Sequence, residues 1–71
     1  MDEFIPERVG ARRKELCMTQ KELAEKSGLS AVTVSLMEKG KKEPRAGTIS
    51  KIAAALGADI GYFFGRRTNN S

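Results

Sequence analysis

The chain has 71 residues, a formal net charge of +4 at pH 7 and a sequence pI of about 9.6. This length suits one domain over residues 1–71, and the basic charge suits a polyanionic partner. There is no histidine and no Gly-rich phosphate loop, HExxH or GxSxG pattern, so we expect no enzyme, metal or cofactor. The lone Cys17 excludes an internal disulfide and fits a reducing cytoplasm. No apolar run predicts a membrane span, no small-molecule site is evident, and MDEFIPERVG is too charged for a signal peptide.

The first predicted helix begins at Pro6 and extends to about Cys17. Proline suits the first helical position because the N–H that it lacks would have no partner inside the helix. Val9, Arg13 and Leu16 then continue the helical spacing.

The second predicted helix covers Gln20 to Ser27. Thr19 and Glu22 are three residues apart, which is the spacing of a capping box. Each side chain of such a pair satisfies a free backbone N–H at the start of the helix. Leu23 and Ala24 are expected to face inward, with Ala24 at the crossing with the next helix.

A tight turn and a third helix, from about Ala31 to Lys39, follow directly. Gly28 can adopt the left-handed conformation that reverses the chain, and Ser30 is a favourable N-cap. Val34 and Met37 are three residues apart and share the inner face of this helix. Two short helices joined by a glycine-containing turn form a helix-turn-helix, whose second helix enters the DNA major groove.

The remaining sequence predicts two more helices and no strands. A polar loop from Gly40 to Gly47 leads to a helix that begins between Ala46 and Thr48 and ends at Gly57. A short fifth helix, Ile60 to Phe64, would be capped by Asp59 and would close the core. The folded part is expected to cover about residues 6–65, with 66–71 as a frayed tail. The predicted core consists of Leu23, Ala24, Val34, Met37, Ile49, Ile52, Ala53, Leu56, Ile60 and Phe63.

The segments TQKELAEKSGLS, MEKGKKEP, ISKIAAALG and IGYFF, in this order and spacing, resemble the Cro/C1-type (XRE-like) helix-turn-helix family. The resemblance covers roughly residues 9–65. It implies an all-α, lambda-repressor-like bundle of five short helices that binds duplex DNA sequence-specifically as a transcriptional regulator, for example a repressor. It also implies a palindromic site and a homodimer, with the region near Phe64 as candidate contact. Three positions differ from the family: Cys17 replaces a common glycine, Arg12 an apolar residue and Arg45 a serine-like cap.

The resemblance places a phosphate contact at Gln20, which could alternatively be only a helix former. Lys39, Lys41, Lys42 and Arg45 follow the recognition helix, where phosphate contacts compete with the interpretation of an ordinary solvated loop. Arg13 and Glu38 match a family ion pair between the first and third helices.

The outward face of the predicted recognition helix, residues 31–39, carries no charge between Ala31 and Met37. It has none of the Arg, Asn and Gln side chains that read bases bidentately, so we expect packing on thymine methyl groups and an operator rich in A·T pairs. The predicted DNA-binding residues are Gln20, Ser30, Ala31, Val32, Thr33, Ser35, Leu36, Lys39, Lys41 and Arg45.

The same uncharged, partly apolar face keeps a second function open. It would also suit an antitoxin-like or co-activator-like module whose main partner is another protein. The operator sequence, the repressor or activator sense, any effector, and the oligomeric state of the free chain do not follow from the sequence.

Overall fold

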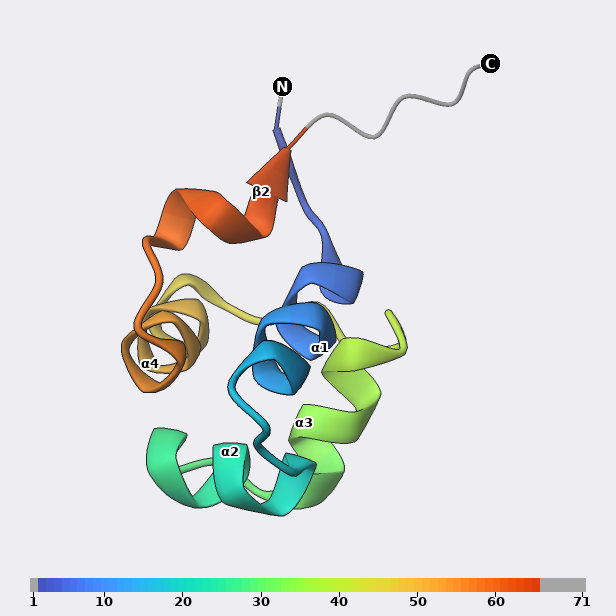
Figure 1. Ribbon diagram of the computed structural model, residues 1–71. Helices are drawn as coiled ribbons and strands as arrows, with labels where there is room; N and C mark the ends of the chain where they lie inside the picture. Colours follow the sequence, from blue (N-terminus) through green and yellow to red (C-terminus); the bar gives the residue numbers. More distant parts are fainter. Residues whose placement is uncertain (1, 66–71) are drawn as a thin grey trace.

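A computed structural model describes residues 2–65 and confirms the helical fold class. In Figure 1, α1 occupies the middle of the molecule, with α3 to its right, α4 to its left and α2 below. Two short strands correct the expectation that the chain has none. The elements of the described residues are β1 (Glu3–Phe4), α1 (Pro6–Glu15), α2 (Gln20–Ser27), α3 (Ala31–Glu38), α4 (Ala46–Leu56), the 3-10 helix η1 (Ile60–Phe63) and β2 (Phe64–Gly65).

Helix α1 begins at Pro6 as expected but ends at Glu15, two residues earlier than predicted. The reason is Cys17, whose φ of 56° is left-handed and cannot continue a right-handed helix. The N–H groups of Cys17 and Met18 instead donate to the carbonyls of Lys14 and Arg13, at 2.9 and 3.0 Å. Cys17 therefore has the conformation for which glycine is suited.

Helix α2 has the predicted capping box. Thr19 Oγ1 accepts the backbone N–H of Glu22 at 3.0 Å, and Glu22 Oε1 accepts that of Thr19 at 2.8 Å. Gly28 ends the helix with a φ of 77°, which confirms the predicted turn. Ser30 Oγ accepts the N–H of Thr33 at 3.1 Å and caps α3, which ends at Glu38 with Lys39 as its C-cap.

Helix α4 begins at Ala46, within the predicted range, and stops at Gly57, which has a φ of 61°. Its N-cap is Arg45, whose side chain makes no capping hydrogen bond. At the other end, Arg12 Nε donates to the carbonyl of Leu56 at 3.0 Å, so the arginine that replaces an apolar residue satisfies a free acceptor of α4.

The predicted fifth helix is a single 3-10 turn, η1, and Phe64 belongs to β2 instead. Asp59 is its N-cap by position but forms no side-chain capping bond. The chain extends after Phe63 because Phe64 pairs with Phe4, and Gly65 with Glu3, in an antiparallel ribbon. Arg8 Nη1 reinforces the closure by donating to the carbonyls of Tyr62 and Phe64, at 2.9 and 3.2 Å.

The core lies between the four α-helices and η1 and agrees with the prediction except at two positions. Ile60 is 45% exposed, because it opens the 3-10 turn beside a surface groove instead of pointing inward. Val9, on α1, is fully buried but was not in the predicted set. The buried apolar residues are Val9, Leu23, Ala24, Val34, Met37, Ile49, Ile52, Ala53, Leu56 and Phe63.

Within residues 2–65, no helix has both the length and the apolar character needed to cross a bilayer. The predicted tail, residues 66–71, lies outside the described part of the chain.

Candidate nucleic-acid interface

The outer face of α3 is open and uncharged, as predicted. Val32 is 68% exposed and Ala31 is exposed, while Val34 and Met37 on the opposite face are fully buried. The outward residues further along the helix, Thr33, Ser35 and Leu36, are half-buried. An apolar residue as open as Val32 has no packing role within this chain, so its side chain is available to a partner.

Two hydroxyl groups at the start of α3 are paired. Ser30 Oγ accepts the N–H of Thr33 at 3.1 Å and donates to Thr33 Oγ1 at 2.9 Å. In this arrangement the Thr33 hydroxyl keeps its own proton for a further bond, because a hydroxyl carries one donor beside its two acceptor lone pairs. Thr33 is therefore suited to a phosphate oxygen or to an acceptor on a base edge.

The basic loop that follows α3 lies beside this face. Lys39, Lys41, Lys42 and Arg45 are all exposed. A hollow of about 320 Å³ between α3 and the start of α4 is lined by Thr33, Lys42 and Arg45, among others. Thr33 of α3 thus shares one hollow with two cations of the loop, and the acidic Glu43 lines it as well. Of the predicted site residues, Thr33 and Arg45 line this hollow.

Gln20, the predicted phosphate contact, has an additional role that the sequence did not indicate. Its side-chain Nε2 donates to Glu38 Oε1 at 3.0 Å, and the residue is half-buried. This bond joins the first residue of α2 to the last residue of α3, which are 18 positions apart in the sequence. No local sequence signal predicts it, because the contact depends on how the two helices cross.

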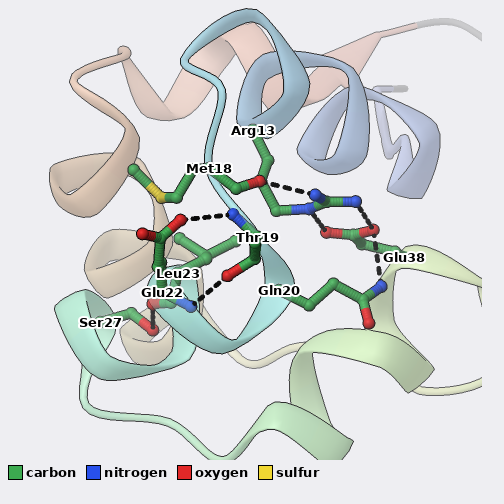
Figure 2. A network of polar contacts seen from close by, with 8 residues as sticks. All are labelled: Arg13, Met18, Thr19, Gln20, Glu22, Leu23, Ser27 and Glu38. Carbon is green, nitrogen blue, oxygen red and sulfur yellow. Dashed lines mark hydrogen bonds and ion pairs between the residues drawn. The ribbon is translucent and has the colours of Figure 1, made fainter.

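Glu38 is the centre of a polar network beneath these residues (Figure 2). Arg13 Nε and Nη2 donate to its two carboxylate oxygens at 2.7 and 3.1 Å, a bidentate arrangement. Arg13 Nη1 also donates to the carbonyl of Met18 at 2.7 Å. The side chains of Arg13 and Glu38 are each 11% exposed, which confirms the predicted structural ion pair.

The network shifts the pKa of both charged groups. The hydrogen bond to Glu38 raises the pKa of Arg13, with burial opposing it. Burial alone raises the pKa of the Glu38 carboxyl. Hydrogen bonds from Arg13 and Gln20, with the positive charge of Arg13, reverse this and hold the pKa of Glu38 below its usual value. Glu38 is therefore ionised at neutral pH, with its charge balanced by Arg13.

Among the described residues, no group of histidine, cysteine, aspartate and glutamate side chains is arranged to hold a metal ion. The α3 face with its basic loop is a feature that could act on a partner. Comparison with known proteins agrees with this assignment, because the model of the helix-turn-helix family (HTH_3) matches residues 9–63.

The chain belongs to this helix-turn-helix family. Its members are DNA-binding regulators, in agreement with the expectation of a non-enzymatic protein. An immunity repressor protein of Bacillus phage phi105 is 34% identical over 64 residues, which cover 90% of this chain and 44% of the relative. The chain thus spans less than half of that repressor's length. An uncharacterized HTH-type transcriptional regulator of the archaeon Methanothermobacter thermautotrophicus is 45% identical over 47 residues, covering 66% of this chain and 68% of the relative.

Solved structures confirm the lambda-repressor-like architecture. The DNA-binding domain of the P22 c2 repressor is 31% identical, with a TM-score of 0.81 over 86% of this chain and 80% of that chain. The same repressor in complex with a synthetic operator gives a TM-score of 0.79 at 31% identity, over 86% of this chain and 92% of that chain. SinR, the master regulator for biofilm formation, was solved in complex with DNA. Its TM-score is 0.77 at 29% identity, over 82% of this chain and 97% of that chain.

Proposed function

We propose that this chain is the DNA-binding part of a transcriptional regulator, with α3 in the major groove of an operator duplex. The observation that carries the proposal is the open, uncharged α3 face flanked by an exposed basic loop. Absence of carboxylates from that face avoids repulsion by phosphates, and the loop supplies cations for the DNA backbone. One relative is named an immunity repressor protein, and the similar P22 c2 repressor and SinR were each solved with DNA, which supports this function. DNA binding also favours the cytoplasmic location predicted from the lone thiol.

The chemistry of α3 restricts how it would read a sequence. Ala31, Val32 and Leu36 cannot form hydrogen bonds with base edges, but they can pack on the thymine C5-methyl group. Ser35 and Thr33 can bond to bases or phosphates and discriminate weakly. We therefore propose an operator rich in A·T pairs at the contacted positions, with DNA shape adding specificity.

The test begins with selection of bound sites from a random duplex pool, followed by replacement of contacted thymines with deoxyuridine. This removes only the methyl group and should weaken binding by about 1 kcal/mol, comparable with a buried methyl group. Val32→Gln should leave the fold intact, because Val32 is 68% exposed, and should shift preference toward adenine.

Lys51→Gln is a matched control, since Lys51 is exposed on α4 and does not line the hollow beside α3. It should preserve the preference. If deoxyuridine sites bind equally well and Val32→Gln changes neither affinity nor preference, α3 is not the reading helix. The alternative, a protein-interaction module that uses the apolar side chains of the same face, would then be favoured.

We further propose that two copies bind a palindromic site. A groove of about 310 Å³ is lined by apolar residues of β1, α4 and η1 and by Phe64 of β2, including Phe4, Ile49 and Ile60. This groove lies at the region near Phe64 that the family resemblance suggests for the dimer contact. Sedimentation on a selected palindrome should give two chains per duplex, and Ile60→Lys should reduce cooperative binding without lowering affinity for a half-site.

A further inference from the structure

Gln20 is the single glutamine of the chain, and its side chain is already held in place in the free protein. A glutamine at the exposed start of a helix ordinarily samples many rotamers. Here Nε2 donates to Glu38 Oε1 at 3.0 Å. The acceptor is a carboxylate, which has no donor when ionised, so the amide must present its NH₂ group and not its carbonyl oxygen to Glu38. The orientation of the amide is therefore determined by chemistry as well as by geometry.

The acceptor is itself fixed. Arg13 binds both oxygens of Glu38, at 2.7 and 3.1 Å, and is held in turn by the Met18 carbonyl at 2.7 Å. Figure 2 shows the chain of contacts from Met18 through Arg13 and Glu38 to Gln20. Since the Arg13 and Glu38 side chains are each only 11% exposed, neither can swing into solvent without breaking buried contacts.

We propose that Glu38 is a positioning residue for DNA binding, which fixes the Gln20 amide so that its second N–H donates to a backbone phosphate. This proposal rests on the function proposed above. An amide NH₂ has two donors, and Glu38 uses one of them. The Gln20 side chain then loses its conformational freedom when the protein folds, so this entropy cost does not arise again when it contacts a phosphate. Arg13 balances the Glu38 charge, so the carboxylate that orients Gln20 does not repel the phosphate.

The first test uses nuclear magnetic resonance on the unaltered free protein. With one glutamine, the side-chain NH₂ signals of Gln20 need to be distinguished only from those of Asn69 and Asn70. We expect a heteronuclear Overhauser effect for the Gln20 side chain close to that of the backbone, and slower exchange for one of its two amide protons. Fast averaging of the side chain would overturn the positioning role. Because this measurement needs no substitution, it remains decisive even if a Glu38 variant does not fold.

The second test is a cycle of affinities for a selected duplex. Gln20→Ala should weaken binding about tenfold or more, as expected for one hydrogen bond to a charged phosphate group. The loss should be the same for all sequences, and the salt dependence should not change because Gln20 carries no charge. Glu38→Gln, with its fold verified by circular dichroism, should cost a similar factor. The double variant should bind no worse than the weaker single variant.

A purely structural role for this bond would lower the melting temperature and leave the affinity of the folded protein unchanged. That result would overturn the proposal, as would independent losses that multiply in the double variant. The matched control combines Gln20→Ala with Lys41→Ala, because Lys41 is exposed and takes part in none of the hydrogen bonds of the network. Those losses should multiply.

The outcomes also separate this proposal from the function on which it rests. Failure of the unaltered protein to bind any duplex from a random pool would contradict both. Specific binding that Gln20→Ala leaves unchanged would overturn only the role of Gln20 and Glu38.

Discussion

Cys17 is the one residue other than glycine with a positive φ among residues 2–65. A left-handed backbone costs roughly 1–2 kcal/mol for a residue that has a Cβ. The conformation is needed nonetheless, because the turn from α1 to α2 directs the Met18 carbonyl toward Arg13. The family preference for glycine at this position therefore has a direct physical explanation in this chain.

Cys17→Gly should raise the free energy of unfolding by about 0.5–1 kcal/mol, because relief of strain exceeds the added entropy of the unfolded chain. Thermal melting should show a midpoint several degrees higher. Gly28→Ala is the reverse test, because it adds a Cβ to a residue in the left-handed conformation. A Cβ at position 28 meets no atom within 4 Å, so only the φ of 77° opposes the substitution. It should destabilise by about 1 kcal/mol. An unchanged midpoint in Cys17→Gly would show that the left-handed turn is not present in solution.

Arg13 and Glu38 should be strongly coupled. Removal of one partner leaves a desolvated charge, at a cost of about 3–5 kcal/mol for a buried pair, whereas removal of both should cost less than the sum. A double-mutant cycle with Arg13→Met and Glu38→Gln, monitored by urea unfolding, measures this coupling. Coupling below about 1 kcal/mol would be that of an exposed pair and would contradict the observed burial.

The same pair predicts the response to acid. The pKa of Glu38 is lower in the folded protein than in the unfolded chain, so the stability it provides is complete above the unfolded pKa. That stability is lost as the pH falls from the unfolded value through the lower folded value. The free energy of unfolding should therefore decline below about pH 4–5, and less steeply in the Arg13→Met/Glu38→Gln double variant. Parallel profiles for the two proteins would rule out a lowered pKa for Glu38.

Two side-chain contacts could not be predicted from the sequence. Arg12 binds the Leu56 carbonyl and Gln20 binds Glu38, across 44 and 18 positions respectively. The sequence marks both residues as polar groups on a helix, which is equally compatible with solvent. The ion pair of Arg13 and Glu38 was predictable because a known family contains a similar pair and because both residues lie in register with apolar neighbours on their helices.

At the scale of elements, α4 begins without a side-chain cap, as α1 does, but it also lacks the proline and the acidic first-turn residue that α1 has. Its N-cap, Arg45, has the extended backbone of a cap, but its side chain accepts no hydrogen bond from the first turn. Arginine cannot do so, because its guanidinium has donors only. We propose that Arg45 contacts the DNA backbone and does not serve as a helix cap, since it is exposed beside Thr33 and Lys42.

Arg45→Ser should therefore have opposite effects on stability and binding. The new hydroxyl should stabilise α4 by about 1 kcal/mol, the typical contribution of a capping side chain. Loss of a phosphate contact should reduce affinity and flatten the dependence of log K on log salt by about 0.9. Melting curves and titrations at several salt concentrations give the two numbers. Lys51→Ser, which removes the same charge from the exposed middle of α4, should show neither effect. If Arg45→Ser and Lys51→Ser had the same slope of log K against log salt, Arg45 would not be part of the DNA interface.

The element boundaries also show which signals are reliable. The capping box at Thr19 and the glycine at position 28 define α2 correctly, because both act through hydrogen bonds or φ angles within a few residues. The strands β1 and β2 are two residues each, too short for any alternation of apolar and polar residues. Their pairing depends on the closure of the whole chain by η1, which no local pattern encodes. For the same reason Ile60 was wrongly placed in the core.

For the whole molecule, the charge distribution predicts strongly salt-dependent binding. If about four cations per chain reach phosphates, the slope of log K against log salt is about −3 to −4 for one chain and twice that for two. Lys41→Ala should flatten it by about one unit per chain without a change of site preference. Filter binding over a range of salt concentrations measures the slope. A changed preference would mean that Lys41 reads bases, and an unchanged slope would exclude it from the backbone contacts.

The pairing of Glu3 with Gly65 has a practical consequence for constructing hybrid proteins. Both ends of the described chain leave the fold side by side, at the opposite end of the molecule from α2 (Figure 1). A fluorescent reporter or a dimerising module attached to either end would therefore emerge from the same place, far from α2 but beside the basic loop that follows α3. A short peptide joining the two ends could also close the chain into a ring, and the fold would then tolerate a new opening in an exposed loop.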